Sequence, residues 1–232
     1  MWKPLVLDTW ETVATTYPAS KYGVARINHK RRGGGIYYAE YVRGVTFLRY
    51  PPKSLVTSLR INGVVWMTDC APYMWSLASF AERASGNVLV AGLGLGLVIH
   101  ELVKNPNVTH ITVVDREPDV IALVALLLPQ DSRIEIVESD FDLFVMHDSP
   151  SVKRDTIIWD LGLWGSSGEE HNKLKALYIR PIMQSFYGPA TQVFVHGLDR
   201  DPAGEQFIQD NPELVSRLQG GILSKKQLTE SP

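Results

Sequence analysis

From residue 87 onward, short apolar segments alternate with segments of helical periodicity, and this alternation limits the possible folds more than any other feature of the chain. Strands are expected at 88–91, 110–114, 133–137, 156–159 and 191–196, and helices at 97–104, 118–128, 141–146, 169–186 and 203–218. Strands that alternate with helices form βαβ crossovers within a parallel sheet. The sequence therefore predicts an α/β fold with a doubly wound, mostly parallel, Rossmann-like sheet.

The preceding part of the chain is richer in short β-like segments, which predicts a small N-terminal β-rich subdomain. Segments 55–61 and 64–68 flank Asn62-Gly63. Asn-Gly is the strongest two-residue hairpin signal, because both residues tolerate positive φ. A helix is expected to follow over 71–84, with Leu77 and Ala81 on one face.

A second hairpin is predicted nearer the N-terminus. Segments 22–28 and 36–42 are rich in β-forming residues, and they flank a basic, glycine-rich stretch at 30–35. We therefore expect residues 1–84 to form the β-hairpin-rich subdomain with its linking helix. Residues 85–232 are expected to form the Rossmann-like cofactor-binding domain.

Three glycines, Gly92, Gly94 and Gly96, lie between the first expected strand of this domain and its helix. Bare main chain at such a turn lets a ligand approach closely, and glycine tolerates the unusual φ angles that the turn needs. The helix that follows offers free N–H groups at its start. A tight turn without a ligand is the alternative, but the strand–turn–helix context favours ligand binding.

An acidic residue, Asp115, ends the next expected strand, 19 residues after Gly96. A carboxylate at this place can accept hydrogen bonds from both hydroxyls of a ribose; the alternative is a solvated strand-end acid or a helix cap. The last position of the dinucleotide fingerprint is Leu97 here, where close packing of helix and strand requires Gly or Ala. That bulk argues against a pyrophosphate-bridged cofactor.

The pattern G-x-G-x-G resembles motif I of class I S-adenosylmethionine-dependent methyltransferases. Residues 55 to 165 look like the spermidine synthase branch of that superfamily. The similar segments are the small hairpin at 61–65, the polar and aromatic entry at Thr68-Asp69 and Tyr73, the cofactor turn at 87–96, the ribose-binding strand end at 113–118, the adenine-binding segment at 138–141, and the strand at 156–160 that ends in the catalytic aspartate.

The resemblance implies a role for each matching residue. It implies that S-adenosylmethionine or its decarboxylated form is bound by Gly92, Gly94, Gly96, Asp115, Asp140 and Phe141. It implies that Asp160 is catalytic and that the acceptor lies near Asp69 and Tyr73, and we add Trp164 as an aromatic wall. The alternatives are an N-cap for Asp140 and ordinary packing for the aromatic residues.

One departure from the spermidine synthase pattern bears on the reaction. Members of that family carry a second aspartate three positions after the catalytic one, and this chain has Leu163 there. Loss of such a charge-assisted contact costs about 1.5–3 kcal/mol. We therefore expect a methyltransferase of unknown acceptor; the alternatives are an aminopropyltransferase that uses decarboxylated S-adenosylmethionine, and a non-catalytic scaffold that retains the cofactor fold.

Composition and charge limit the partners. The formal net charge of −2 creates no global field that would attract nucleic acid or anionic membrane. The expected transferase reaction implies a small-molecule acceptor. No apolar run is long enough to span a bilayer, and Cys70 is the single cysteine, which favours a cytoplasmic location. His171 and His196 could flank the site, although no histidine pair has metal-ligand spacing. Oligomeric state stays open; relatives of the resembled family commonly dimerise, which allows a homodimer.

Overall fold

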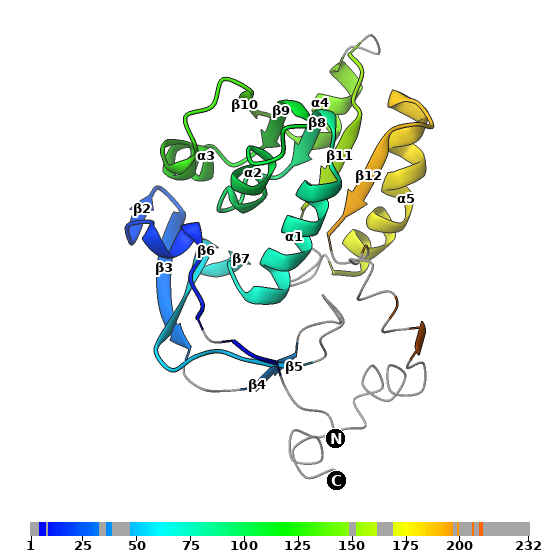
Figure 1. Cartoon of the computed structure of the whole chain (residues 1–232). Coiled ribbons are helices and arrows are strands. Elements are labelled where there is room, and N and C mark those ends of the chain that lie inside the picture. The colour runs from blue at the N-terminus through cyan, green and yellow to red at the C-terminus, as the bar shows by residue number, and fades with distance from the viewer. Residues whose placement is uncertain are drawn as a thin grey trace. The chain divides into compact units, whose positions relative to one another are not determined.

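The computed structural model describes residues 5–7, 9–32, 36–38, 47–148, 152–161, 169–196, 199, 206 and 209–210 (Figure 1). The chain divides into two compact units, of which one comprises 1–11, 31–55 and 200–232, and the other comprises 12–30 and 56–199. The boundary between residues 84 and 85 stays a prediction from the sequence pattern.

A five-stranded parallel sheet forms the centre of the larger unit. Its strands, in spatial order, are β10 (Ile134–Glu138), β9 (Val108–Asp115), β8 (Gly86–Ala91), β11 (Thr156–Trp159) and β12 (Gln192–Val195). The chain runs outward from β8 through β9 to β10 and then returns to the other side of β8. This arrangement confirms the predicted Rossmann-like fold, and it puts the reversal of strand order between β8 and β11, where open α/β sheets bind ligands.

Helices cover both faces of this sheet (Figure 1). They are α1 (Ala71–Arg83), α2 (Leu97–Leu102), α3 (Pro118–Val124) with the 3-10 turn Ala125–Leu127, α4 (Phe141–His147) and α5 (Glu169–Tyr187). Because side chains alternate along a strand, Val88 and Val90 pack with α1, α2 and α3, whereas Leu89 and Ala91 pack with α4 and α5. Burial on both faces explains why these strands read as continuous apolar runs.

A four-stranded sheet precedes the parallel one along the chain. It consists of β2 (Ser20–Tyr22), β3 (Ala25–Arg32), β6 (Ser54–Ile61) and β7 (Val64–Thr68), in that order. Antiparallel β6 and β7 are joined by Asn62 and Gly63, whose φ angles are 51° and 80°. The predicted Asn-Gly hairpin is therefore confirmed.

The predicted hairpin of 22–28 with 36–42 is wrong for the described residues, while 33–35 and 39–42 lie outside them. Strand β4 (Ile36–Tyr38) pairs with β5 (Phe47–Arg49) in a separate sheet with β1 (Leu5–Val6), whereas β3 pairs with β2. The segment expected to be one strand instead turns at Gly23, which has a φ of 51°. The carboxylate of Asp119 accepts the Val24 N–H at 2.7 Å and fixes this turn, a contact that the local sequence does not reveal.

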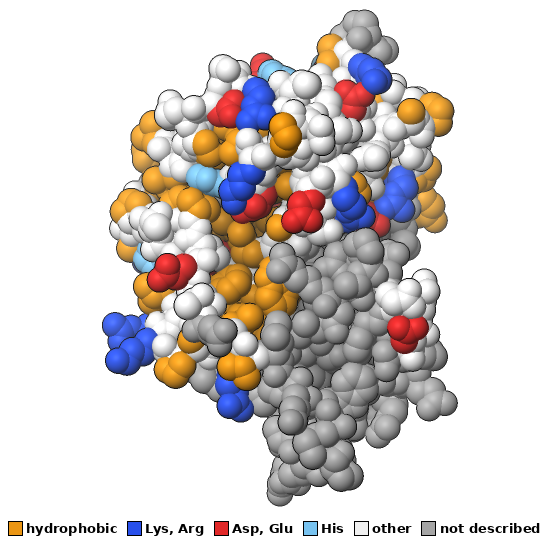
Figure 2. Space-filling model, in the orientation of Figure 1, with side chains coloured by type: hydrophobic (Ala, Val, Ile, Leu, Met, Phe, Trp, Pro, Cys, Tyr) orange, Lys and Arg blue, Asp and Glu red, His pale blue; other side chains and the backbone are white. Residues whose placement is uncertain are grey.

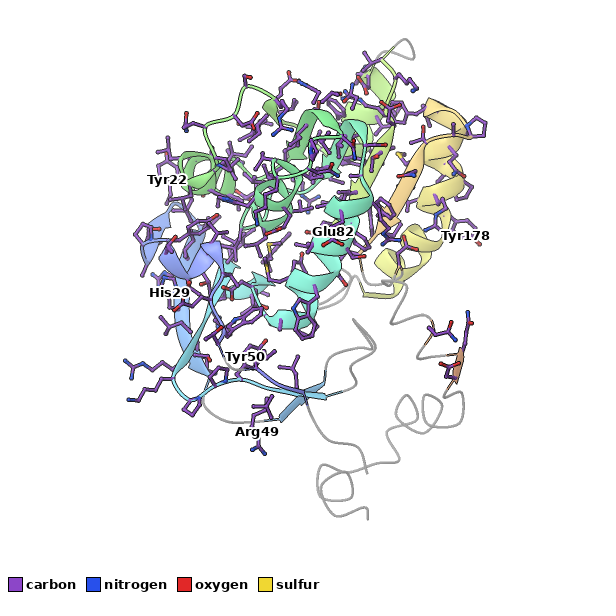
Figure 3. All side chains as sticks on the ribbon, viewed as in Figure 1. Tyr22, His29, Arg49, Tyr50, Glu82 and Tyr178 are labelled. Atoms are coloured by element: carbon purple, nitrogen blue, oxygen red, sulfur yellow. The ribbon has the colours of Figure 1, made fainter. Side chains whose placement is uncertain are left out.

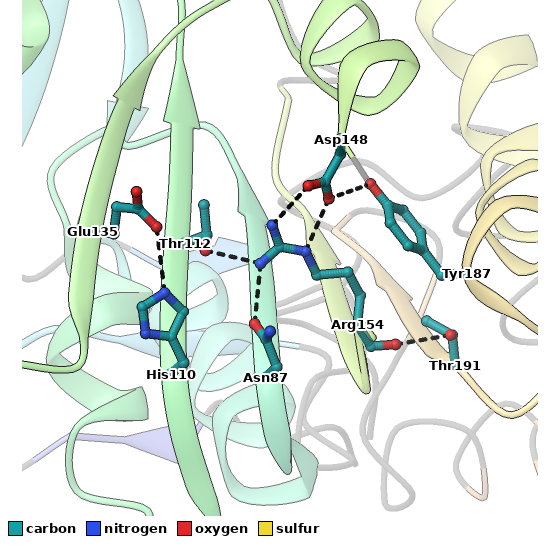
Figure 4. Close-up of polar contacts among 8 residues, drawn as sticks. All are labelled: Asn87, His110, Thr112, Glu135, Asp148, Arg154, Tyr187 and Thr191. Atoms are coloured by element: carbon teal, nitrogen blue, oxygen red, sulfur yellow. Dashed lines mark hydrogen bonds and ion pairs between the residues drawn. The ribbon is translucent and has the colours of Figure 1, made fainter. Parts of the chain in front are cut away.

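A buried ion pair lies at the amino end of β11, away from the end that carries the predicted site (Figure 4). Arg154 lies 3.0 Å from Asp148 and also donates to Asn87 and Thr112, while Tyr187 donates to Asp148. These contacts join β8, β9, α5 and the residue after α4. The network holds the edge of the sheet opposite the predicted site.

No helix in the described part of the chain is long and apolar enough to cross a membrane. On the face shown in Figure 2, basic and acidic side chains of the described residues are interspersed. The helix predicted over 203–218 falls mostly outside the described residues, of which 206 and 209–210 are helical.

Candidate functional site

The predicted ligand-binding residues gather at one edge of the parallel sheet. Trp159 is in register with Ala91 on one side and with Val195 on the other. Because the strands are parallel, the residues that follow their carboxyl ends meet at this edge, namely Gly92, Asp115, Asp140, Asp160 and His196. The tertiary structure thus brings together residues that are up to 104 positions apart in the sequence, from 92 to 196.

The glycine turn is closed by hydrogen bonds within the protein. Gly92 N–H donates to Val114 at 2.8 Å, and Gly96 N–H donates to Leu93, also at 2.8 Å. The Leu95 N–H meets the Met67 sulfur at 2.9 Å. Any contribution of these three amides to ligand binding would compete with bonds that the turn already makes.

Each glycine of the turn has a left-handed φ, at 96°, 53° and 71° for Gly92, Gly94 and Gly96. A side chain at Gly94 would collide with the sulfur of Met67, and one at Gly96 would collide with Leu128. A side chain at either position would therefore need Met67 or Leu128 to move, in addition to adopting a left-handed φ. The missing side chain of Gly92 instead faces the main-chain oxygen of Asp160, 3.3 Å from an ideal Cβ.

The Asp115 carboxylate stabilises the same turn. One oxygen accepts the Leu93 N–H at 2.8 Å, and the other accepts the Glu117 N–H at 2.9 Å. Glu117 is the N-cap residue of α3, so Asp115 fastens the turn that leads into this helix and does not cap the helix itself. An ionised carboxylate has about four acceptor positions, so two amide donors leave capacity for sugar hydroxyls.

Asp140 is the N-cap of α4. Its Oδ1 accepts the N–H groups of Asp142 and Leu143 at 3.0 and 3.3 Å, and its Oδ2 lies 3.8 Å from the Arg116 guanidinium. Phe141 is 4% exposed and packs in the core with α5. The geometry of Phe141 therefore supports a packing role; the predicted adenine contacts of Asp140 and Phe141 stay predictions.

The most unusual side-chain arrangement is a buried acid and phenol. Tyr73, in the first turn of α1, donates its hydroxyl to the two carboxylate oxygens of Asp160, at 2.6 and 2.7 Å. The Asp160 side chain is 5% exposed, and this burial raises its pKa to about 7, against the opposing effect of the Tyr73 hydrogen bond. Burial, followed by the proximity of Asp160, raises the pKa of Tyr73. Tyr73 therefore stays protonated near neutral pH, whereas Asp160 titrates there.

His196 completes this group of side chains, although the sequence suggested only that it could flank the site. Its Nδ1 lies 3.5 Å from Asp160 Oδ1, and its ring centroid lies 4.1 Å from that of Tyr73. Burial lowers the pKa of His196 to about 4, so its ring is neutral at pH 7. The available sequence signal was its position directly after the last strand of a parallel sheet.

Asp69 does not reach this group by any described contact. Its side chain is fully buried, where it accepts the Thr12 hydroxyl at 2.5 Å and the Thr57 N–H at 2.6 Å. Burial raises its pKa, opposed by these hydrogen bonds. The structure therefore gives Asp69 the role of fastening residue 12 to β6, and the predicted acceptor contact stays a prediction. Trp164 lies outside the described residues.

Sequence reasoning missed the residues that support the glycine turn from outside. The Tyr17 hydroxyl lies 3.1 Å from the carbonyl oxygen of Leu95 and 2.9 Å from His100 Nε2. His29, on β3 (Figure 3), donates from Nε2 to the Tyr17 carbonyl oxygen at 2.8 Å. No local pattern marks these residues, since each acts on a segment distant in the sequence.

The comparisons with known proteins give similarity in fold. No protein-family model matches the sequence, and no curated protein matches it. Similar solved structures include a spermidine synthase from Thermotoga maritima, with 18% identity over 56% of each chain and a TM-score of 0.35. A probable spermidine synthase from Corynebacterium glutamicum is 16% identical over 66% of this chain and 54% of that one, with a TM-score of 0.43.

A third similar structure is the N-methyltransferase NodS from Bradyrhizobium japonicum. It is 21% identical over 37% of this chain and 44% of that chain, with a TM-score of 0.28. The chain thus resembles spermidine synthases and a methyltransferase in its Rossmann-like fold. It spans about half the length of the spermidine synthases that it matches, at 56% and 54%.

Proposed function

We propose that this chain binds S-adenosylmethionine, or its decarboxylated form, at the carboxyl edge of the parallel sheet and transfers a group from it to a small-molecule acceptor. The transferred group is most simply methyl. The observation that carries the proposal is the buried Asp160, held by Tyr73 directly after β11 and beside Gly92 at the reversal of strand order. A buried acid with a pKa near neutrality at a ligand-binding edge is typical of a functional site.

The residues at this edge fit an adenosine-type ligand. Asp115 has unused acceptor capacity for ribose hydroxyls. Asp140 Oδ2 lies 3.8 Å from the Arg116 guanidinium, which is beyond hydrogen-bond distance. Gly92 presents bare main chain next to Asp160. When bound, S-adenosylmethionine would supply a methyl group on a cationic sulfur.

Asp160 would take up the proton that the acceptor molecule releases when it is methylated. A general base acts best when its pKa lies near the working pH, and burial places the pKa of Asp160 at about 7. Tyr73 fixes the carboxylate with two short hydrogen-bond distances, so little rearrangement is needed when a substrate O–H or N–H approaches. Methyl transfer would then leave the methylated acceptor, a neutral thioether and a protonated Asp160.

Aminopropyl transfer is the second candidate, and the chemistry of the acceptor weighs against it. A diamine is held by more than one anionic contact in the resembled family, whereas this chain has Leu163 in place of the second acid. Asp160, if protonated, would also lose its attraction for a cation. We therefore favour an acceptor that enters the site without a double positive charge.

Calorimetry with S-adenosylmethionine and with its decarboxylated form tests the binding step. We expect saturable binding of the former, weakened at least about tenfold in Asp115→Ala, because a charge-assisted hydrogen bond contributes about 1.5–3 kcal/mol. Asp115→Asn keeps the shape of the side chain and controls for collapse of the turn. Glu135→Ala removes an exposed acid from the same sheet and should bind normally. No saturable binding of either ligand at millimolar concentration would contradict the proposal.

Transfer itself is tested with a panel of small O–H and N–H acceptors and with putrescine. Asp160→Asn should abolish turnover of any accepted substrate while S-adenosylmethionine still binds. Turnover that survives this substitution would contradict the role of Asp160 as the base. Binding without turnover of any acceptor would instead favour the non-catalytic scaffold.

A further inference from the structure

His196 occupies a place that the proposed function does not yet use. It follows β12 directly, and its N–H donates to the Trp159 carbonyl at 3.0 Å, which continues the ladder between β11 and β12. Asp160 follows β11 in the same way. The two side chains are therefore fixed side by side by the register of two parallel strands.

The surroundings of Asp160 contain few groups that could share its proton. Among the described residues, the titratable groups that face it or its partner are Tyr73 and Cys70 from the start of α1, and His196 from the end of β12. The His196 side chain is 11% exposed, and its ring is tilted 53° against that of Tyr73. No lysine or arginine forms an ion pair with Asp160 in the described part of the chain.

We infer that His196 is a further positioning residue of the site. Together with Tyr73, His196 holds the Asp160 side chain in place and determines whether Asp160 faces the ligand as a carboxylate or as a carboxylic acid. This inference rests on the proposed role of Asp160 in transfer. His196 would act through Asp160 and would not touch the reacting atoms.

The chemistry of imidazole explains how one side chain can serve both forms of the acid. A neutral imidazole carries one N–H donor and one acceptor nitrogen, and the tautomer can change with the partner. Facing an ionised Asp160, Nδ1 can carry the proton and donate it; facing the protonated acid, Nδ1 can be the acceptor. Tyr73 donates to the ionised carboxylate, and His196 Nδ1 offers the protonated acid an acceptor in addition to the phenol oxygen.

Replacement of His196 by phenylalanine would keep a ring against Tyr73 and remove the nitrogen that faces Asp160. The ionised acid then loses a polar neighbour, and loss of polar surroundings disfavours a charged form more than a neutral one. The Asp160 titration should therefore move to higher pH. His196→Asn places an amide near the position of Nδ1 and should restore much of the original midpoint.

The test is a ¹³C carboxyl NMR titration of the whole chain labelled at aspartate, with the Asp160 signal assigned by Asp160→Asn. We expect a wild-type midpoint at about 7. His196→Phe should raise it by at least about half a pH unit, His196→Asn should lie closer to wild type, and His110→Phe, at an exposed histidine, should leave it unchanged.

Two results would overturn the inference. One is an unchanged Asp160 midpoint in folded His196→Phe. The other is an equal shift in His196→Phe and His196→Asn, since packing alone would then account for it. If His196→Phe fails to fold, His196→Leu, which also removes the ring nitrogens, replaces it: a raised midpoint in that variant supports the inference and an unchanged midpoint refutes it. The titration needs no ligand, so it decides the role of His196 even if S-adenosylmethionine does not bind.

Discussion

The hydroxyl of Tyr73 lies 2.6 and 2.7 Å from the two carboxylate oxygens of Asp160, a residue 87 positions further along the chain. This contact ties the first turn of α1 to the carboxyl end of β11. It also keeps a buried acid in one orientation at the edge of the sheet where open α/β proteins bind ligands. The stability of the protein should therefore depend on pH in a way that reports on this site.

Asp160 and His196 should affect stability in opposite directions as pH changes. The folded-state pKa of Asp160 is about 7 against an ordinary value of 3.8, so its contribution is full below pH 3.8 and is lost as pH rises to 7. The folded-state pKa of His196 is about 4 against 6.5, so its contribution is full above pH 6.5 and is lost as pH falls to 4. The two effects oppose each other between pH 4 and 6.5.

Single substitutions should separate these two effects. Relative to wild type, Asp160→Asn should lose stability as pH falls from 6.5 to 4, and His196→Phe should gain stability over the same interval. Each difference is bounded at about 4 kcal/mol, since one pKa unit corresponds to about 1.4 kcal/mol. Urea unfolding at a series of pH values measures both, and differences from wild type cancel the other titrating groups. Slopes of the same sign in the two variants would contradict the assignment.

Replacement of Asp69 should damage the fold more than the site. Asp69→Ala leaves the Thr57 N–H and the Thr12 hydroxyl without their buried acceptor, which costs about 1–3 kcal/mol for an unsatisfied group. Urea unfolding gives this loss, with Thr16→Ala, at an exposed residue, as the control. Calorimetry on the folded variant should find unchanged affinity for S-adenosylmethionine; undiminished stability together with weakened binding would contradict the structural role of Asp69.

The buried pair of Arg154 and Asp148 should be a strong determinant of stability. Arg154→Met removes one charge and leaves the other buried beside Tyr187, which typically costs about 3–5 kcal/mol. Lys104→Met breaks an exposed pair with Glu101 and should change stability by less than about 0.5 kcal/mol. Thermal or urea unfolding of the two variants compares them directly. Equal effects would mean that burial of the Arg154 pair does not matter.

The glycine turn should resist a side chain at Gly94 because of Met67. Gly94→Ala combines the cost of a left-handed φ, about 1–2 kcal/mol, with a collision against the Met67 sulfur. Gly63→Ala, whose side chain would meet open space, isolates the cost of φ alone. In a Met67→Ala background, Gly94→Ala should therefore cost about as little as Gly63→Ala. A double-mutant cycle by urea unfolding measures this, and purely additive costs would contradict it.

Several features of the fold could be predicted from sequence because they depend on neighbouring residues. Strand 156–159 was predicted at the bounds that it has, and the Asn62-Gly63 hairpin follows from local φ preferences. The hairpin predicted around residues 30–35 failed for a non-local reason, since β3 lies between β2 and β6 and has no edge left for β4. Pairing with a strand more than 20 residues away overruled local preference there.

The candidate site likewise combines features that could be predicted from neighbouring residues with features that depend on distant contacts. The sequence placed Asp115 and Asp160 at strand ends, and parallel pairing brought those ends together. The same reasoning could not distinguish Asp160 from Asp69. Asp160 accepts a hydrogen bond from Tyr73, whereas Asp69 accepts hydrogen bonds from Thr12 and Thr57. Both are acids in an expected active-site segment, and only their surroundings differ.

By itself, the sequence determined the alternation of strands and helices, the glycine turn and the acids that follow the strands, because these are set by periodicity and by backbone preference along a few residues. The tertiary structure alone decided which acid is buried, which histidine faces it and which side chain lies against Gly94. Those properties depend on desolvation and on contacts between segments far apart in the chain, and no local pattern encodes them.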